Sequence, residues 1–368
     1  MCVIPKATRF WKPVNGNLLH TVAALGVFDL RSCPMRKQFS VAIASLFFCA
    51  AAHAQTVFHF TSPVTQKSMQ EAATIIRTVA DIPQVTILEA QQTIQFQGPA
   101  AQVVMAQWIL TQLDTPGNEN ALLQYTLPTG DDVVRVNFLA NVTTNLEAQE
   151  MLTTLRTVAD IAKVFNYSER QAMVIRASSA DLAFAEWIVD QLNVPVTAKL
   201  DATPRVYTGA VKGYGPNAKT GETARVNYLT NGATQQGTQQ IMTVLRMVGI
   251  IQKVFVYTDL HALTLRGPAS EIARCEWLIQ QLAQPAAQGT QVYETPNADD
   301  VTRIFFLSNA TPQALIAAVT SIKAETHIQQ AYQLTQPSAI VVRGTSDQIA
   351  AALQVMAQHN GLAMLEHR

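Results

Sequence analysis

The feature that most constrains this chain is a sequence motif that recurs at fixed distances. Residues 77–82 read RTVADI, residues 156–161 repeat them, and residues 246–250 repeat them more loosely. Three tryptophans recur with the same two spacings, 79 residues (187 − 108) and 90 residues (277 − 187), and they are Trp108, Trp187 and Trp277. Since two landmarks shift together, we conclude that the chain consists of tandem copies of one structural unit.

Each copy contains the periodicities of five short elements. Residues 134–139 alternate between apolar and polar side chains, as strands do, and apolar residues at helical spacing follow them. Two further strands are expected at residues 163–168 and 172–177, separated by a short polar turn. A second helix then presents one apolar face, formed in the second copy by Leu182, Ala185, Val189 and Leu192. The unit is therefore predicted to be βαββα and about 60 residues long.

These units predict an α+β fold of four tandem βαββα modules, each a small sheet with two helices packed on one face. We expect module 1 at residues 55–116, module 2 at 131–195, module 3 at 222–285 and a cap-like module 4 at 300–360. Pro116, Pro195 and Pro285 end the second helices of the first three modules. Residues 125–128 and 293–296 occupy matching places in two linkers, where we expect each to dock an extra strand.

The N-terminal region has the pattern of an export signal that begins late. From Met35 the chain has two basic residues, an apolar stretch at 39–52, and an Ala-His-Ala cleavage sequence that ends at Ala54. We therefore interpret residues 35–54 as a signal peptide and residues 1–34 as an upstream segment that arises from a start codon assigned too early. A transmembrane anchor is the alternative, but the apolar run is about 14 residues, short of the roughly 18 to 20 that span a bilayer. Lipidation of Cys49 is a minor alternative because the usual small residues do not precede it.

Export to the periplasm or the outer membrane has a consequence for the cysteines. Cys2, Cys33 and Cys49 all precede the expected mature start, so Cys275 is alone in the mature chain and cannot form an intramolecular disulfide. With 48% hydrophobic and 14% charged residues, the chain must instead be stabilised by packing. Its 26 basic and 26 acidic residues cancel, which argues against nucleic acid or an anionic membrane surface as a partner.

Signals for chemistry are weak. No histidine pair has the H-x-x-x-H spacing that places two metal ligands on one helical face, so we expect no metal site and no cofactor. Cys275 could be a nucleophile, but it occupies the place of Ala106 and Ala185, so we interpret it as a buried core residue. Residues 215–220 resemble a phosphate-binding loop but lack the glycine before the lysine, and they are better explained as linker. We expect no catalytic residue and no enzymatic activity.

Asp81 and Asp160 share the repeated motif and could be paired carboxylates. Because Ile250 takes their place in module 3, a local structural role beside the repeated Arg77 and Arg156 is the better interpretation. An arginine in the last turn of a helix stabilises it by about 0.3 to 1 kcal/mol through the helix dipole.

The repeated tryptophan faces away from its own module. At about 100° per residue it lies nearly opposite the apolar core positions of the second helix, and a second apolar stripe surrounds it. We expect this stripe to contact a neighbouring module or a partner, and its residues are Trp108, Trp187, Trp277, Met105 and Phe184. Module 4 has Gln354 at the tryptophan position, as expected for the last module of an array. Exposed aromatics that stack on a ligand are the alternative.

The modules resemble the periplasmic N-domains of secretins, the ring-forming outer-membrane channels of secretion and pilus systems. The resemblance lies in residues 306–311 entering the first helix, residues 338–345 leading into the second, and residues 108–116 closing a module. It implies side-by-side packing, protein partners and no catalytic residues. Secretins continue into a long glycine-rich channel domain, whereas this chain stops at residue 368, so we expect no channel.

The leading hypothesis is a non-enzymatic exported scaffold with protein partners in the cell envelope, possible self-association, and no membrane span after signal cleavage. The first alternative is an enzyme or small-ligand binder that uses clefts between modules. The second is nucleic-acid binding, since a βαββα order also occurs in KH-like modules, but the sequence has neither a G-x-x-G loop nor a basic face.

Overall fold

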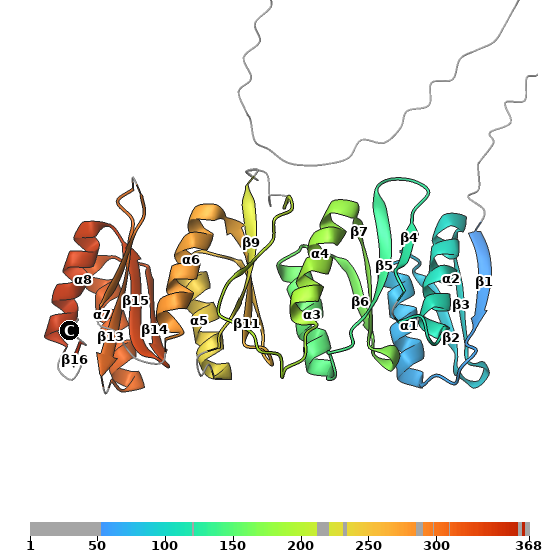
Figure 1. Ribbon diagram of the computed structural model, residues 1–368, viewed down its shortest axis with the longest axis horizontal. Coiled ribbons are helices and arrows are strands. Elements are labelled where there is room, and N and C mark those ends of the chain that lie inside the picture. Colours follow the sequence, from blue (N-terminus) through green and yellow to red (C-terminus); the bar gives the residue numbers. More distant parts are fainter. Residues whose placement is uncertain are drawn as a thin grey trace, which may run out of the picture. The chain divides into compact units, whose positions relative to one another are not determined.

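Four groups of strands and helices follow one another along the chain, and they confirm the α+β fold class (Figure 1). The computed structural model describes residues 53–119, 121–211, 221–230, 234–284, 290–296, 298–308, 310–359 and 363–364. These residues belong to one unit, 51–368. The expected upstream segment 1–34, most of the signal segment 35–54, residues 213–216 of the middle linker and Pro285 lie outside the described residues.

Module 1 is a three-stranded antiparallel sheet of order β1-β3-β2 with two helices. A single 3-10 turn, η1 (Glu89–Gln91), joins its second and third strands. Its elements are β1 (His53–His59), α1 (Gln66–Thr78), β2 (Gln84–Leu88), β3 (Thr93–Pro99) and α2 (Ala100–Asp114).

Modules 2 to 4 repeat this order. Module 2 consists of β5 (Asp132–Phe138), α3 (Asn145–Thr157), β6 (Lys163–Tyr167), η2 (Ser168–Arg170), β7 (Ala172–Ser178) and α4 (Ser179–Leu192). Module 3 consists of β9 (Glu222–Tyr228), α5 (Gln235–Met247), β10 (Lys253–Tyr257), β11 (Ala262–Pro268) and α6 (Ala269–Leu282). Module 4 consists of β13 (Val301–Ser308), α7 (Pro312–Thr326), β14 (Gln330–Thr335), β15 (Ser338–Gly344), α8 (Ser346–Gln358) and the short β16 (Ala363–Met364).

An extra strand precedes each of modules 2, 3 and 4. The strands β4 (Leu123–Thr126) and β12 (Gln291–Glu294) pair antiparallel with β5 and β13, which confirms the expectation for the two outer linkers. The middle linker contributes the two-residue β8 (Arg205–Val206), paired with β9. The sheets of modules 2 and 3 therefore have four strands.

The first helix of every module begins at a threonine. Its hydroxyl accepts a hydrogen bond from a backbone N–H of the first turn, which satisfies one of the unpaired donors there. These threonines are Thr65, Thr144, Thr234 and Thr311. In α3 the glutamate at 147 completes a capping box. Burial alone would raise the pKa of Glu147, but hydrogen bonds from the N–H groups of Thr144 and Thr143 lower it overall.

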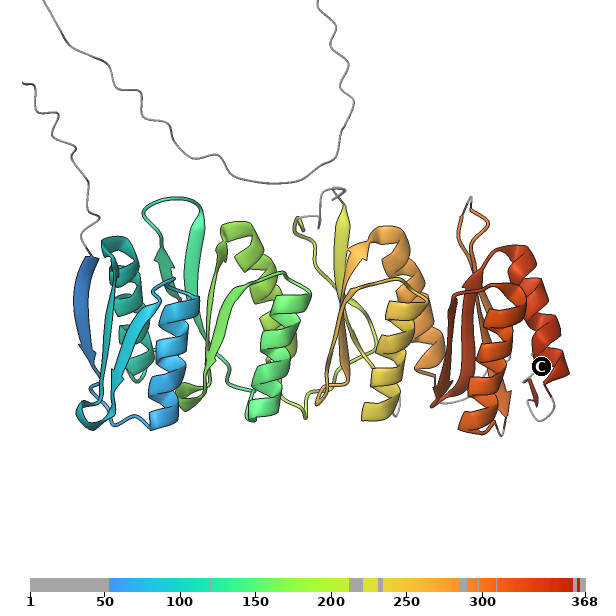
Figure 2. The same ribbon diagram turned by 180° about the vertical axis from the view of Figure 1, so that it is seen from behind.

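Both faces of the inner sheets are covered. One face carries the module's own two helices, as expected, and the first helix of the preceding module lies on the other: α1 on β6, α3 on β10 and α5 on β14 (Figures 1 and 2). Val134, Val136 and Val174 of module 2 accordingly belong to the same apolar cluster as the core of module 1. The same sharing joins module 2 to module 3 and module 3 to module 4. Each of the first three modules thus shares its apolar core with the outward sheet face of the next module.

Candidate interfaces between the modules

We call the three contacts between consecutive modules joint 1/2, joint 2/3 and joint 3/4. In each joint, a first helix and the turn after it meet the outward face of the next sheet. Three kinds of polar or aromatic contact recur there, in addition to the apolar packing.

The first recurring contact is an arginine on the third strand of the following module. In joint 1/2, Nη1 of Arg176 donates to the backbone carbonyl of Val79 at 3.1 Å and to Oδ2 of Asp81 at 2.8 Å. Its Nε also donates to Asp132 of its own module at 2.9 Å. One guanidinium therefore satisfies the end of the preceding helix and an aspartate on each side of the joint.

Joint 2/3 repeats this contact with a more deeply buried arginine. Nη1 of Arg266 lies 3.1 Å from the Val158 carbonyl and 3.0 Å from Asp160, and its Nε lies 2.7 Å from Glu222. The Arg266 side chain is only 4% exposed. Module 1, which has no preceding module among the described residues, has Gln97 at this position.

For the repeated RTVADI motif, the predicted local role is confirmed for the arginines but is wrong for the aspartates. The arginines are local, since Arg77 donates to the Val85 carbonyl at 2.9 Å and Arg156 to the Val164 carbonyl at 2.9 Å. The aspartates are not local. Asp81 pairs with Lys163 of module 2, and Asp160 pairs with Lys253 of module 3 in the same way. Both have a positive φ at the end of the helix, which turns them toward the next module.

Joint 3/4 keeps the arginine contact, since Nη1 of Arg343 donates to the Val248 carbonyl at 3.3 Å, but it replaces the aspartate–lysine pair. Ile250 stands where the aspartates are and Gln330 where the lysines are, so both partners have changed together. In place of that pair, Arg274 of α6 pairs across the joint with Asp300 at 2.5 Å. Arg343 of β15 pairs with Asp300 of its own module at 2.7 Å, as Arg176 does with Asp132 and Arg266 with Glu222. Burial alone would raise the pKa of Asp300, but the hydrogen bond from Arg343 and the charge of Arg274 outweigh it and lower the pKa.

The second recurring contact comes from the middle of the first helix. The carboxylate of Glu71 accepts from the N–H and the hydroxyl of Ser168, each at 2.7 Å. Glu150 does the same for Thr258, and the amide oxygen of Gln240 accepts from the N–H of Thr335 at 3.0 Å. In module 4 the equivalent position is the exposed Ala317, which has no such function.

The third recurring contact contains the tryptophans. Each tryptophan is half-buried and packs against a tyrosine of the following module. That tyrosine lies on the extra strand or directly after it. The ring centroids lie 5.6 Å apart for Trp108 and Tyr125, 5.4 Å for Trp187 and Tyr207, and 5.5 Å for Trp277 and Tyr293. Such distances allow favourable aromatic packing. Gln354 of module 4 is exposed.

The position three residues before each tryptophan is buried in all three joints. Met105 and Phe184 are 1% and 3% exposed, and the Phe184 ring lies 4.9 Å from that of Tyr207. Sequence reasoning missed the third member of this set, Arg274, which is also 1% exposed and forms the ion pair of joint 3/4. The equal spacing to Met105 and Phe184 was the signal that could have found it.

One sheet face of module 1 is covered by no other described element, and its residues differ from those of the covered faces. Positions filled by Val134, Val174 and Arg176 in module 2 are filled in module 1 by Gln55, Gln95 and Gln97. Glutamine requires no burial and has no charge to pair. Module 1 is therefore more polar on the face that the other modules bury, although Val57, the equivalent of Val136, is 43% exposed there.

Side chains of the kinds used in catalysis do not cluster in the described part of the chain. Cys275 is fully buried, as the sequence indicated, and burial raises its pKa to about 12, which leaves the thiol protonated and unreactive. No cluster of three His, Cys, Asp or Glu side chains suitable for a metal ion occurs among the described residues. Nor does any helix in those residues have the length and apolarity to cross a membrane.

Comparison with known proteins gives distant likenesses. No family model and no curated protein matches the sequence. Similar solved structures include the N-terminal domain of the secretin XcpQ from Pseudomonas aeruginosa, with 14% identity, a TM-score of 0.17, and 39% of this chain and 63% of that chain covered. ExeD from Aeromonas hydrophila shows 15% identity, a TM-score of 0.15, and coverage of 80% and 59%. APE0754, a protein of unknown function from Aeropyrum pernix, shows 11% identity, a TM-score of 0.21, and coverage of 39% and 84%.

This chain thus spans less than two thirds of either secretin chain. TM-scores this low establish no common architecture, so membership of the secretin N-domain family remains a proposal.

Proposed function

We propose that this chain is a non-enzymatic exported scaffold of secretin N-domain type, which holds four modules in a fixed order and presents their side surfaces to protein partners in the cell envelope. A role as an accessory of a secretion or pilus assembly is part of this proposal. The family is inferred from the sequence motifs, and the scaffold role is inferred from the contacts between modules.

One observation carries the scaffold role: polar contacts recur at all three joints between described modules, and the helix position that supplies one of them is an alanine in module 4, which is the last described module. Glu71, Glu150 and Gln240 each bind the next module, whereas Ala317 of module 4 stands free. A joint with a shared apolar core and a buried ion pair transmits geometry from module to module, as linkers alone do not. The chain is thus suited to holding surfaces at fixed spacing.

The tryptophans support the same role. As proposed interface residues, Trp108, Trp187 and Trp277 connect the second helix of one module to the extra strand of the next. Their rings are already engaged by Tyr125, Tyr207 and Tyr293, which leaves them less suited to stacking on a ligand.

Export is supported by the sequence pattern of residues 35–54. The strand β1 begins at His53, so cleavage after Ala54 would remove two residues and leave Gln55 to His59 paired with β3. Module 1 would therefore keep most of its first strand in a mature chain that starts at Gln55.

The test expresses the full chain with a C-terminal tag in a Gram-negative host. We expect recovery from the periplasmic or envelope fraction with Gln55 as the first residue. Photo-crosslinking from exposed positions of the intact envelope should then capture defined protein partners, and size-exclusion chromatography with light scattering should give the oligomeric state. A matched variant, Arg266→Gln, loosens joint 2/3 without changing the outer surface, and it should capture fewer of the partners that contact two modules.

A chain that stays in the cytoplasm would contradict export. A strict monomer that captures no envelope protein, or that captures the same proteins with and without Arg266, would contradict the scaffold role.

A further inference from the structure

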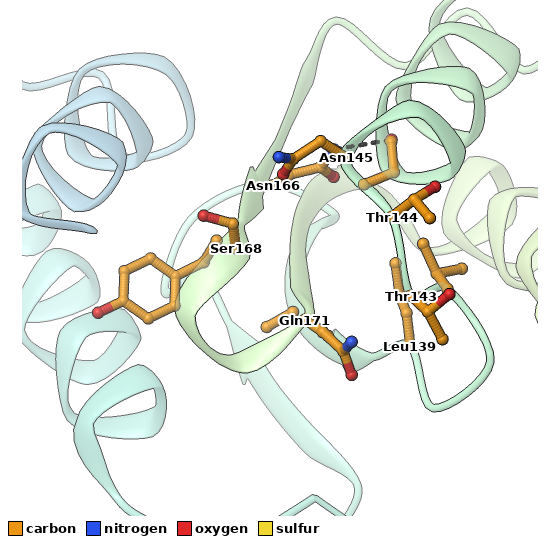
Figure 3. A pocket seen from close by; sticks show the side chains of 11 residues that line it. Leu139, Thr143, Thr144, Asn145, Asn166, Ser168 and Gln171 are labelled. Carbon is orange, nitrogen blue, oxygen red and sulfur yellow. Dashed lines mark hydrogen bonds between the residues drawn. The ribbon is translucent and has the colours of Figure 1, made fainter. Parts of the chain in front are cut away.

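A cavity of about 370 Å³ lies within module 2 at the end of the sheet where α3 begins (Figure 3). The loop before α3 forms one wall, and the turn between β6 and β7 forms the other. Figure 3 shows Asn145 and Asn166, Ser168, Gln171, and Thr143 and Thr144 arranged around it. Cavities of about 300 to 1,000 Å³ are the size that holds small molecules.

The repeats explain why the cavity forms in this module. Ala148 of α3 lines it, and the equivalent residues are larger: Met69, Thr238 and Leu315. Leu139 lines it where module 1 has the bulkier Phe60. At Ala148, module 2 therefore lacks side-chain volume that the other three modules use to fill the same place.

The cavity also contains a buried polar group that the fold does not need. Asn166 is 7% exposed and stands where modules 1 and 3 have Ile87 and Val256. Its Nδ2 donates to the Ala148 carbonyl at 2.7 Å, while its Oδ1 has no hydrogen-bond partner in the described part of the chain. A buried acceptor without a partner is destabilising, and such groups in folded proteins are usually satisfied by water or a ligand.

The rim of the cavity has further unpaired polar groups. In module 1 the amide oxygen of Gln92 accepts from the N–H of Val64 at 2.7 Å, and in module 3 Nδ1 of His261 lies 3.4 Å from the Thr238 hydroxyl. Gln171 occupies the same place and is exposed, but among the described residues its side chain makes no such contact. Its amide is therefore available to a ligand both as donor and as acceptor.

The chemistry of the lining restricts the ligand. None of the lining residues is charged, so neither an anion nor a cation would find a counter-charge. The hydroxyl of Thr143 donates to Glu147 at 3.2 Å, and its oxygen can still accept. Leu139, Val142 and Ala148 add an apolar wall. Amides and hydroxyls beside a small apolar patch are suited to a neutral molecule with many hydroxyl groups.

We propose that this cavity binds a neutral, hydroxyl-rich molecule of monosaccharide size, which forms hydrogen bonds with the exposed amide of Gln171 at its rim. The site adjoins joint 1/2, because Ser168 lines the cavity and also binds Glu71 of module 1. An occupied cavity would fix the β6–β7 turn and so strengthen this joint.

The experiment uses the full chain, with glucose, galactose and N-acetylglucosamine as probes. Saturation-transfer NMR measures binding, and thermal unfolding measures the shift in Tm. We expect at least one of these probes to bind the wild type and to raise its Tm. Glucuronate and glucose 6-phosphate, of similar size but charged, should bind more weakly.

Two variants restore the residues that the other modules have. Asn166→Val should raise the Tm without ligand and leave binding in place, because Oδ1 of Asn166 is enclosed. Gln171→Ala should weaken binding about three- to tenfold, the effect of one neutral hydrogen bond. Ala148→Met should fill the cavity and abolish binding. Ile316→Gln, an exposed change in module 4, is the matched control and should leave binding unchanged.

The proposal is overturned if no neutral probe binds the wild type, or if Gln171→Ala binds the probes as tightly as the wild type. It is also overturned if binding persists in Ala148→Met, or if the charged probes bind as tightly as the neutral ones. These outcomes are independent of the scaffold role, because they test no partner and no export.

Discussion

Replacement of Arg266 by glutamine should weaken joint 2/3 more than any exposed charge change does. The guanidinium bridges Asp160 and the Val158 carbonyl of module 2 to Glu222 of module 3. Glutamine is the residue that module 1 has at this position, where no joint requires a charge. The substitution removes the shared cation and leaves two carboxylates facing the buried end of a helix.

The size of the effect follows from burial. Removing one partner of a buried ion pair costs about 3–5 kcal/mol. The arginine is 4% exposed and Glu222 is 14% exposed, but Asp160 is 37% exposed and keeps Lys253 beside it. Water can therefore compensate part of the loss at Asp160, and we expect the lower end of the range, about 3 kcal/mol.

Denaturant unfolding measures this value joint by joint. Trp187 lies at joint 2/3, and substitution of Trp108 and Trp277 by phenylalanine leaves it as the reporter of that joint in a chain that starts at Gln55. Since stability in tandem repeats depends on nearest-neighbour contacts, weakening one joint should also split the single unfolding transition into two.

The control is Arg205→Gln. Arg205 pairs with Asp201 at 3.3 Å, with the two side chains 36% and 63% exposed, so the change should cost no more than about 1 kcal/mol. If Arg266→Gln shifts the midpoint no more than this control, the joint does not depend on its buried arginine and the argument is wrong.

Three further changes test other parts of the structure. Gly249→Ala places a methyl group 2.6 Å from Sγ of Cys275 and should destabilise the chain by about 1–3 kcal/mol in urea unfolding, with partial recovery in the double variant that carries Cys275→Ala. Burial and then the charge of Glu147 raise the pKa of Asp259, so the folded chain favours the protonated form, and this stability is lost as pH rises through the raised pKa. Asp259→Asn should therefore have a higher urea midpoint than the wild type at about pH 7 and the same midpoint at about pH 3. Trp187→Ala should lower the stability by about 2–4 kcal/mol in calorimetry, because its half-buried ring packs on another module.

Each of these has an outcome that would contradict it. Full stability of Gly249→Ala would show that the α5 terminus has more room than its neighbours suggest. Equal midpoints of Asp259→Asn and wild type at neutral pH would show that the carboxylate is not repelled across joint 2/3. Unchanged stability in Trp187→Ala would leave the tryptophan free for a ligand, the alternative that its contact with Tyr207 disfavours.

Local sequence determined the elements and their order. The strand expected at residues 163–168 is β6 (Lys163–Tyr167), and the strand expected at residues 172–177 is β7 (Ala172–Ser178). The burial of Cys275 followed from the alanines at its place in other modules. These predictions succeeded because periodicity and capping act over a few neighbouring residues, so each copy contains the information needed for its own five elements.

The tertiary structure alone decided what meets across the joints. Asp160 looked like part of a local motif, yet its partners are Arg266 and Lys253, some 100 residues away. Asn166 looked like one more strand residue until its Oδ1 was found buried without a partner. The same alternating sequence pattern fits an outward sheet face that contacts solvent, a neighbouring module or a ligand. Only the position of the neighbouring module determines which of these an arginine on that face will contact, because that contact depends on chain far away in the sequence.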